Sequence, residues 1–241
     1  MEEVKTRTQN IDKFRVLSGS WLKIIATAAM LIDHIAAVFL RSDPVALFTV
    51  FGRTLTLYAL LRGIGRIAFP IYAFLITEGF IHTGDRKRYG ISLALFALIS
   101  EVPWDLVHHD KFFSIASQNV FFTLFLGYLA ICMAEKYREK PFIQAAWLIG
   151  LLIVSLLLRA DYGISGYCFI VFMYALRERE LLRAVIGCGF LSSRWKAGLA
   201  FIPIALYNGK RGFIRGPVAK YFFYVFYPLH LLVLYLIKVY C

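Results

Sequence analysis

The sequence predicts an all-α protein, a polytopic bundle of about nine transmembrane helices. Three observations support this fold class. Hydrophobic residues make up 60% of the chain and charged residues only 17%, a balance outside the range of soluble domains. Several apolar stretches are long enough to cross a hydrocarbon core of about 30 Å as helices. Basic residues gather in alternate loops, as the positive-inside rule describes for proteins with several spans.

The net charge of +12 is therefore interpreted as a topological signal rather than as a nucleic-acid-binding surface. Placing every basic cluster on the cytoplasmic side puts the amino terminus inside and the carboxyl terminus outside. We expect a multi-pass protein of a bacterial plasma membrane, with the lipid bilayer as a partner and no nucleic-acid partner. The sequence does not determine the oligomeric state. The basic clusters lie at residues 5–15, 86–88, 136–140, 177–183 and 210–220.

The expected spans follow from the apolar stretches and from the polar and proline residues that interrupt them. Pro70 and Pro103 are expected to kink the second and third spans. Residues 41–62 contain two apolar pieces that are each too short to cross, so we expect an external loop with a short interfacial or re-entrant helix. Two short pieces, 181–191 and 195–207, complete the count of nine. The seven longer spans are expected at 21–40, 64–83, 89–108, 120–134, 142–158, 164–176 and 221–240.

Two regions are expected: a polar cytoplasmic amino-terminal segment, 1–20, and a single transmembrane domain, 21–241. The start is too long and too acidic for a signal peptide, so we expect the first span to remain in the mature protein. The four cysteines form no CxxC pair, and we expect thiols packed in helices. The sequence contains no GxSxG, Walker or HExxH motif and no dinucleotide fingerprint, and no metal site is expected.

Two adjacent ionisable residues, Asp33 and His34, lie near the centre of the first apolar stretch. A charge at that depth costs at least about 2.5 kcal/mol, which indicates a proton relay, a ligand site or catalysis. Imidazole suits a general base at neutral pH. The alternative is that His34 is a packed side chain bonded to a neighbouring helix.

Further polar residues are expected in the outer half of the membrane. Glu101 and Asp105 are one helical turn apart in the third span, and Arg66 is the obvious cation to pair with them. Either carboxylate, or Asp33, is expected to orient His34. Asn119 opens the fourth span and belongs to the same polar set. A buried ion-pair network that only fixes helix register is the alternative.

A second set of residues is assigned to ligand binding. In the final span His230 follows Tyr227 and Pro228, and the proline removes a backbone donor at that point. The segment YNGKRG places Asn208, Lys210 and Arg211 at the cytoplasmic mouth. Glycines beside two cations suit a phosphate-bearing ligand, although positive-inside topology alone also explains them. Arg88 belongs to a further basic cluster on that side.

Several stretches of the chain resemble the TraX family, the conjugal-transfer proteins that acetylate the amino terminus of pilin. The likeness covers residues 22–127 and recurs at RADYGISG, YNGKRG and the final span. It implies a distant relation to membrane acyltransferases that modify cell-surface sugars and rely on a histidine in an early membrane helix, a position that His34 matches. The stretches are LKIIATAAMLIDHIAAVF, GRIAFPIYAFLITEGFIHT, FALISEVPWDL, QNVFFTLFLG and YFFYVFYPLHL.

The resemblance implies an integral-membrane acetyltransferase that moves an acetyl group from cytosolic acetyl-CoA to an amine or hydroxyl acceptor on a peptide, saccharide or small molecule at the outer side. In such a reaction Asn119 or Arg66 is expected to polarise the acetyl carbonyl oxygen. Direct transfer and a route through acetyl-histidine both fit these residues. The main alternative is a proton-coupled transporter or flippase, for which buried Asp, Glu and His are equally natural. Such proteins usually have repeated halves, which this sequence lacks. A structural membrane subunit of a secretion or conjugation complex is the third.

Overall fold

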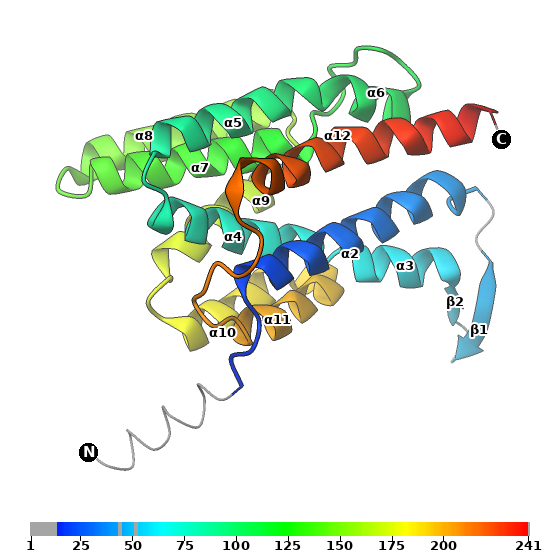
Figure 1. Ribbon diagram of the computed structural model, residues 1–241, viewed down its shortest axis with the longest axis horizontal. Helices are drawn as coiled ribbons and strands as arrows, with labels where there is room; N and C mark the ends of the chain where they lie inside the picture. Colours follow the sequence, from blue (N-terminus) through cyan, green and yellow to red (C-terminus); the bar gives the residue numbers. More distant parts are fainter. Residues whose placement is uncertain (1–13, 43–44, 51–52, 241) are drawn as a thin grey trace.

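The structure, a computed structural model, describes residues 14–42, 45–50 and 53–240 and is mostly helical, as predicted (Figure 1). Of the residues 1–20 assigned to a polar segment, only 14–20 are described, and Gly19 already begins the first helix. The elements are α2 (Gly19–Phe39), β1 (Ala46–Val50), β2 (Arg53–Thr56), α3 (Leu57–Gly65), α4 (Ala68–His82), α5 (Arg86–Ile99), α6 (Glu101–His109), α7 (Val120–Lys136), α8 (Pro141–Leu157), α9 (Gly163–Ala175), α10 (Glu180–Phe190), the 3-10 helix η1 (Ser192–Ala200), α11 (Phe201–Ala205) and α12 (Gly216–Tyr240).

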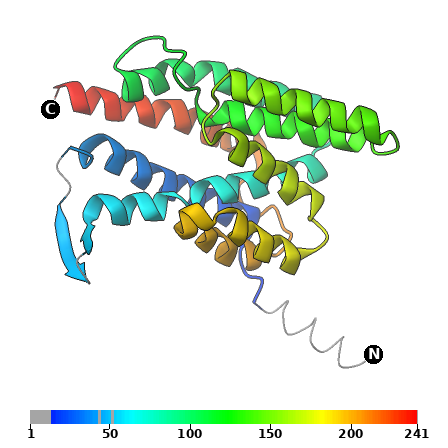
Figure 2. The same cartoon turned by 180° about the vertical axis from the view of Figure 1, so that it is seen from behind.

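The helices form two groups that share a main apolar core, and a smaller apolar cluster lies between α7, α8 and α9. Helix α7 packs against α4, α5, α8 and α9, whereas α2 packs against α3, α4 and α12, and α12 also packs against α6. Figures 1 and 2 both show α2, α3, α6 and most of α12 reaching together past the ends of α7, α8 and α9. The region between α2, α6 and α12 is therefore built by segments from the beginning, middle and end of the chain.

Four helical segments in the described part of the chain are long and apolar enough to cross a membrane: Gly19–Phe39, Leu57–His82, Arg86–His109 and Tyr221–Tyr240. They correspond to the first, second, third and last of the predicted spans. Helices also form at the fourth, fifth and sixth predicted spans, as α7, α8 and α9, and the last two are apolar but shorter. The short piece at 195–207 is divided between η1 and α11 rather than forming one helix.

The surface of α8 is mostly apolar and exposed. It buries only Leu151 and Ser155, and it leaves large apolar side chains such as Phe142, Trp147 and Leu157 exposed. A soluble protein seldom exposes so continuous an apolar face. Together with the four long apolar segments, this surface identifies a membrane protein.

The interpretation of residues 41–62 as a loop with a short interfacial or re-entrant helix is corrected by the structure. Strands β1 and β2 form an antiparallel hairpin in which Ala46 pairs with Thr56 and Val50 with Arg53. The second apolar piece then begins α3, whose first turn is capped by the Thr56 hydroxyl, which accepts a bond from the amide of Ala59. The second candidate span consequently begins at Leu57 instead of Ile64 and includes Arg62.

The two predicted proline kinks are present as helix breaks. Helix α3 ends at Gly65 and α4 begins at Ala68, just before Pro70, and α5 gives way to α6 at Ser100, just before Pro103. A proline ring clashes with the carbonyl four residues upstream and lacks an amide proton, so the preceding turn cannot continue the helix. Both breaks lie inside long apolar segments, where they leave polar groups free to make other contacts.

Candidate functional site

The centre of the candidate site is a pair of histidines on α2 and α12. The Nδ1 atom of His34 lies 2.7 Å from the Nε2 atom of His230, although the two residues are 196 positions apart in the sequence. Both side chains are buried, with 8% of His34 and 6% of His230 exposed. A hydrogen bond between two buried rings fixes both of them and the packing of α2 against α12.

The hydrogen bonds also determine where the protons of this pair are. The Nδ1 atom of His230 lies 2.8 Å from the carbonyl oxygen of Phe226, which can only accept, so this nitrogen carries a proton. In the neutral ring Nε2 of His230 is then an acceptor, and Nδ1 of His34 donates to it. We assign these tautomers from the bonding pattern. They leave Nε2 of His34 with a free electron pair, as a general base requires.

Aromatic and imidazole rings from α6 and α12 surround the pair. The ring of Tyr227 lies 6.0 Å from that of His34, and the ring of His108 lies 6.4 Å away. His108 stacks on Trp104 at 3.7 Å and, unlike the pair, is exposed. The Nδ1 atom of His108 lies 3.1 Å from the carbonyl oxygen of Trp104, and among the described residues no hydrogen bond joins this ring to either ring of the pair.

Arg62 on α3 brings a positive charge to this region. Its guanidinium forms an ion pair with Asp33, and it lies within electrostatic range of His34 and His108. Gly65 permits this arrangement, because a Cβ atom at that position would overlap the Asp33 side chain. Asp33 therefore holds Arg62 rather than orienting the ring of His34.

The side chains of Glu101, Asp105 and Asn119 lie close to one another. They form hydrogen bonds within this region and, among the described residues, none with His34. The Oε2 atom of Glu101 accepts from the side-chain amide of Asn119 at 2.5 Å and from its backbone amide at 3.3 Å. Asn119 caps α7 through the amide of Phe121. The Oδ2 atom of Asp105 accepts from the Ser114 amide at 2.7 Å. These bonds fasten α6 to the beginning of α7 and to the loop before it.

Two expectations about these residues are thus corrected. The His34 ring is bonded to His230, and within the described residues it is not bonded to Asp33, Glu101 or Asp105. Arg66 pairs with neither Glu101 nor Asp105. It lies at the junction of α3 and α4 and lines a cavity with residues of α4, α9, α10 and η1. Backbone amides and Asn119, rather than a cation, satisfy one oxygen of each of the two carboxylates.

The loop between α11 and α12 docks on the amino-terminal end of α2. The carbonyl oxygens of Lys210 and Arg211 accept from the amides of Gly19 and Ser20, and the Ser20 hydroxyl donates to the same Arg211 carbonyl. Asn208 turns the loop by accepting from the Lys210 amide at 3.0 Å. The backbone of this loop therefore caps α2, which leaves the side chains of Lys210 and Arg211 exposed for another role.

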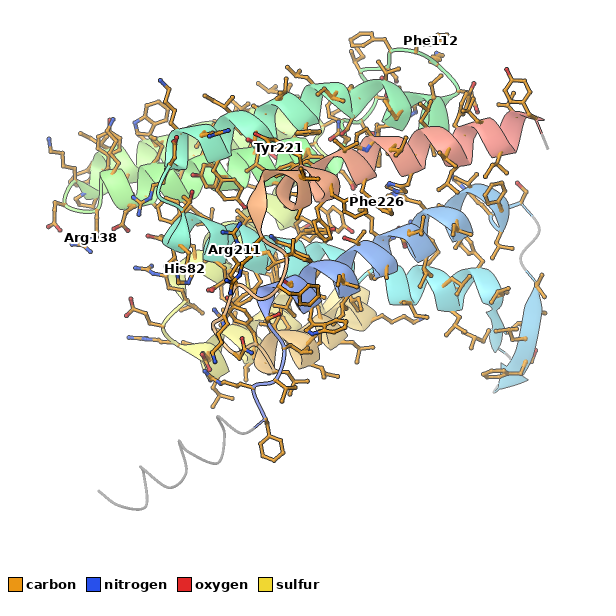
Figure 3. All side chains as sticks on the ribbon, in the orientation of Figure 1. His82, Phe112, Arg138, Arg211, Tyr221 and Phe226 are labelled. Atoms are coloured by element: carbon orange, nitrogen blue, oxygen red, sulfur yellow. The ribbon has the colours of Figure 1, made fainter. Side chains whose placement is uncertain are left out.

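Arg88 is exposed in the first turn of α5, where Asp85 accepts from its amide. The two basic loops that border α5 and α8 lie at one end of the molecule, where Figure 3 labels His82 and Arg138, and Phe112 lies at the other end. Within the described residues no three or more His, Cys, Asp or Glu side chains are placed to hold a metal ion. Cys132, Cys168 and Cys188 are free thiols, and Cys241 lies outside the described residues.

Comparison with known proteins supports the resemblance seen in the sequence. The family model described as TraX protein matches residues 18–238. A probable fimbrial assembly protein, FimC of serogroup H1 from Dichelobacter nodosus, is 28% identical over 255 aligned positions, which cover 94% of this chain and 96% of the relative. No solved structure matches.

Proposed function

Because the chain belongs to the TraX family, we propose that it is an integral-membrane acetyltransferase that uses acetyl-CoA and an amine or hydroxyl acceptor. The observation that carries the proposal is the buried His34–His230 pair, which leaves the Nε2 atom of His34 as a base at the junction of α2, α6 and α12. The alternative of a proton-coupled transporter predicts no binding of acetyl-CoA, so donor binding separates the two classes.

The chemistry at His34 balances without another reactant. Nε2 of His34 removes a proton from the acceptor nitrogen or oxygen as that atom attacks the acetyl carbonyl carbon. The tetrahedral intermediate collapses with cleavage of the carbon–sulfur bond, and the His34 proton is returned to the departing CoA thiolate. The products are the acetylated acceptor and free CoA. His230 accepts a hydrogen bond from Nδ1 of His34 throughout, and this bond spreads the positive charge that forms on the His34 ring.

Arg62 is the residue best placed to stabilise the negative charge that develops on the acetyl oxygen. Its guanidinium has five N–H donors, and the ion pair with Asp33 holds the group in position without using all of them. Asn119 and Arg66, which we expected to act on this oxygen, are engaged with Glu101 and with a separate cavity, respectively. A preorganised donor of this kind contributes about 2.7 to 4 kcal/mol in other acyl-transfer sites.

The acceptor is proposed to be a peptide amine of a pilus or fimbrial subunit. The support is the family's association with pilin and the relative whose name assigns it to fimbrial assembly. A test uses purified protein with acetyl-labelled acetyl-CoA and an envelope fraction from a strain that lacks this gene. Label transferred to a protein band supports this acceptor. Label transferred only to polysaccharide keeps the reaction and changes the acceptor class.

Acetyl-CoA is proposed to dock against Lys210 and Arg211. Replacing both with glutamine should lower the affinity for acetyl-CoA about tenfold or more, since charge-assisted bonds to phosphate contribute roughly 1.5 to 3 kcal/mol each. The maximal rate should change less, because these contacts are made in ground and transition states alike. Calorimetric titration of the detergent-solubilised protein measures the effect. Arg215→Gln is the control for charge near the same loop, and unchanged affinity in the double variant would move the phosphate site towards Arg88.

The proposed orientation places the basic loops in the cytoplasm. A cysteine introduced at Arg138 in a variant without native cysteines should resist an impermeant maleimide added to intact cells, and one at Phe112 should react. Both positions are exposed, so a difference in labelling reports the side of the membrane rather than burial. Each should react after the cells are permeabilised. External labelling at position 138 alone would invert the topology, and with it the side from which acetyl-CoA enters.

A further inference from the structure

A second feature of the molecule lies away from the histidine pair, where Arg66 lines a cavity of about 110 Å³. The cavity is bounded by the start of α4, the start of α9, the end of α10 and η1. Its walls are mostly apolar, with Phe69 and Tyr162 stacked on each other at 4.0 Å on one side. Arg66 is the charged residue among those that line it, and no lining residue is acidic.

The guanidinium of Arg66 has no partner among the described residues. No carboxylate there forms an ion pair with it, and no side-chain hydrogen bond involves it. Asp33 lies within electrostatic range, but its Oδ2 atom is taken by Arg62. Two guanidinium groups thus face one carboxylate, and a positive charge remains in the middle of the Leu57–His82 segment. A charge left unpaired at that depth is costly and indicates a ligand.

The cavity also adjoins the amino-terminal turn of α9, since Ser165 and Gly166 line it. That end of a helix carries a partial positive charge, although the amides of Gly163 and Gly166 already donate to the carbonyl oxygens of Ala160 and Tyr162. Asp161, the acidic residue just before this helix, is not among the lining residues, and its Oδ1 atom accepts from the Tyr162 amide at 2.9 Å. The amino-terminal end of α9 and the guanidinium of Arg66 therefore both make the electrostatic potential in the cavity more positive.

We propose that this cavity binds the anionic oxyacid group, a phosphate or a carboxylate, of a ligand that approaches through the membrane. The cavity has room for a few water molecules, which is enough for such a group and the first atoms of the apolar chain attached to it. Arg66 forms bidentate bonds to the oxygens, and Phe69, Pro70 and Leu191 contact the apolar part. The inference does not rest on acetyl transfer, because it concerns a site that His34 does not reach.

The test uses the full chain in detergent, free of acetyl-CoA, titrated with dioctanoyl phosphatidate as the probe. Arg66→Gln should weaken binding at least tenfold, Arg66→Lys should weaken it less, and Ser165→Leu should prevent binding by filling the cavity without changing charge. Arg138→Gln removes an arginine at an exposed place and should bind as the wild type does. His34→Gln should also bind normally, which separates this site from the transfer reaction.

Competition identifies the source of the anion. If potassium phosphate or sodium acetate displaces the phosphatidate, the site accepts free oxyanions. If neither displaces it and zwitterionic dioctanoyl phosphatidylcholine fails to bind, the site selects an anionic amphiphile. Both results support an anion site at Arg66. Equal binding by wild type and Arg66→Gln, or by wild type and Ser165→Leu, overturns the proposal, and so does absence of binding by the wild type. Helical circular dichroism and size-exclusion profiles confirm that each variant is folded.

Discussion

Replacing His34 with glutamine is expected to lower the rate of acetyl transfer by about 10² to 10⁴, the contribution of a positioned general base. Glutamine has a similar length and is neutral, but it cannot take a proton from the acceptor. Binding of acetyl-CoA should be unchanged, so the loss should appear in the maximal rate. Turnover of acetyl-CoA with an envelope acceptor measures it.

His82→Gln is the matched control. This histidine is exposed at the far end of α4, where its ion-pair partner among the described residues is Glu78, one helical turn away. Its replacement should leave transfer within experimental error of the wild type. A rate within a few-fold of the wild type in His34→Gln would exclude His34 as the base. A parallel loss of acetyl-CoA binding would instead mean that the substitution disturbs the fold.

Much of this arrangement follows from local sequence, because membrane depth makes polar residues stand out. Asp33 and His34 are conspicuous in an apolar stretch. His34 is one member of the histidine pair, and Asp33 lies next to it and holds Arg62. The proline breaks before Pro70 and Pro103 are also local effects, since each depends on one ring and the turn before it. Outside residues 41–62, helix positions along the chain could therefore be predicted to within a few residues.

What sequence could not supply is which helices meet. Nothing in the spacing of His34 and His230 shows that α2 and α12 pack together, and the pairing of the two rings depends on that packing. His230 was thus assigned to ligand binding, and a carboxylate was expected in its place. Glu101 and Asp105 instead find amide donors at Asn119 and Ser114, which satisfy a carboxylate oxygen without a cation.

Arg62 and His108 were missed for different reasons. Arg62 fell in a segment interpreted as a loop, because neither of its apolar pieces is long enough to cross alone. Had α3 and α4 been recognised as one apolar segment, Leu57–His82, Arg62 would have stood out as a charged residue inside it, which is a signal of function. His108 stands next to His109 at the end of a span, where a histidine is ordinarily read as solvated.

The second large effect is expected at His230, which acts through His34 and is a positioning residue. Replacing it with leucine removes the acceptor for the Nδ1 proton of His34 and frees that ring to rotate and to change tautomer. In a serine protease the corresponding loss of the tautomer-fixing partner costs about 10⁴ in rate, and a loss of at least 10² is expected here. The maximal rate should fall while the affinity for acetyl-CoA is retained.

Glutamine and asparagine at position 230 distinguish this role from simple packing. The terminal oxygen of glutamine comes close to the position of Nε2 in histidine, so His230→Gln can still accept from His34 and should recover most of the activity. Asparagine is shorter and reaches only the position of Nδ1, where it can bond to the Phe226 carbonyl but not to His34. His230→Asn should therefore remain as impaired as the leucine variant, although it is the more polar of the two.

A spectroscopic measurement tests the same proposal without turnover. In protein labelled with ¹⁵N at histidine, the Nδ1 and Nε2 resonances of His34 should show a protonated Nδ1 and a free Nε2 in the wild type and in His230→Gln. In His230→Leu and His230→Asn the two tautomers should mix, because no acceptor then selects between them. If His230→Leu keeps both the single tautomer and full activity, the hydrogen bond between α2 and α12 stabilises the fold and the orientation of the base has another origin.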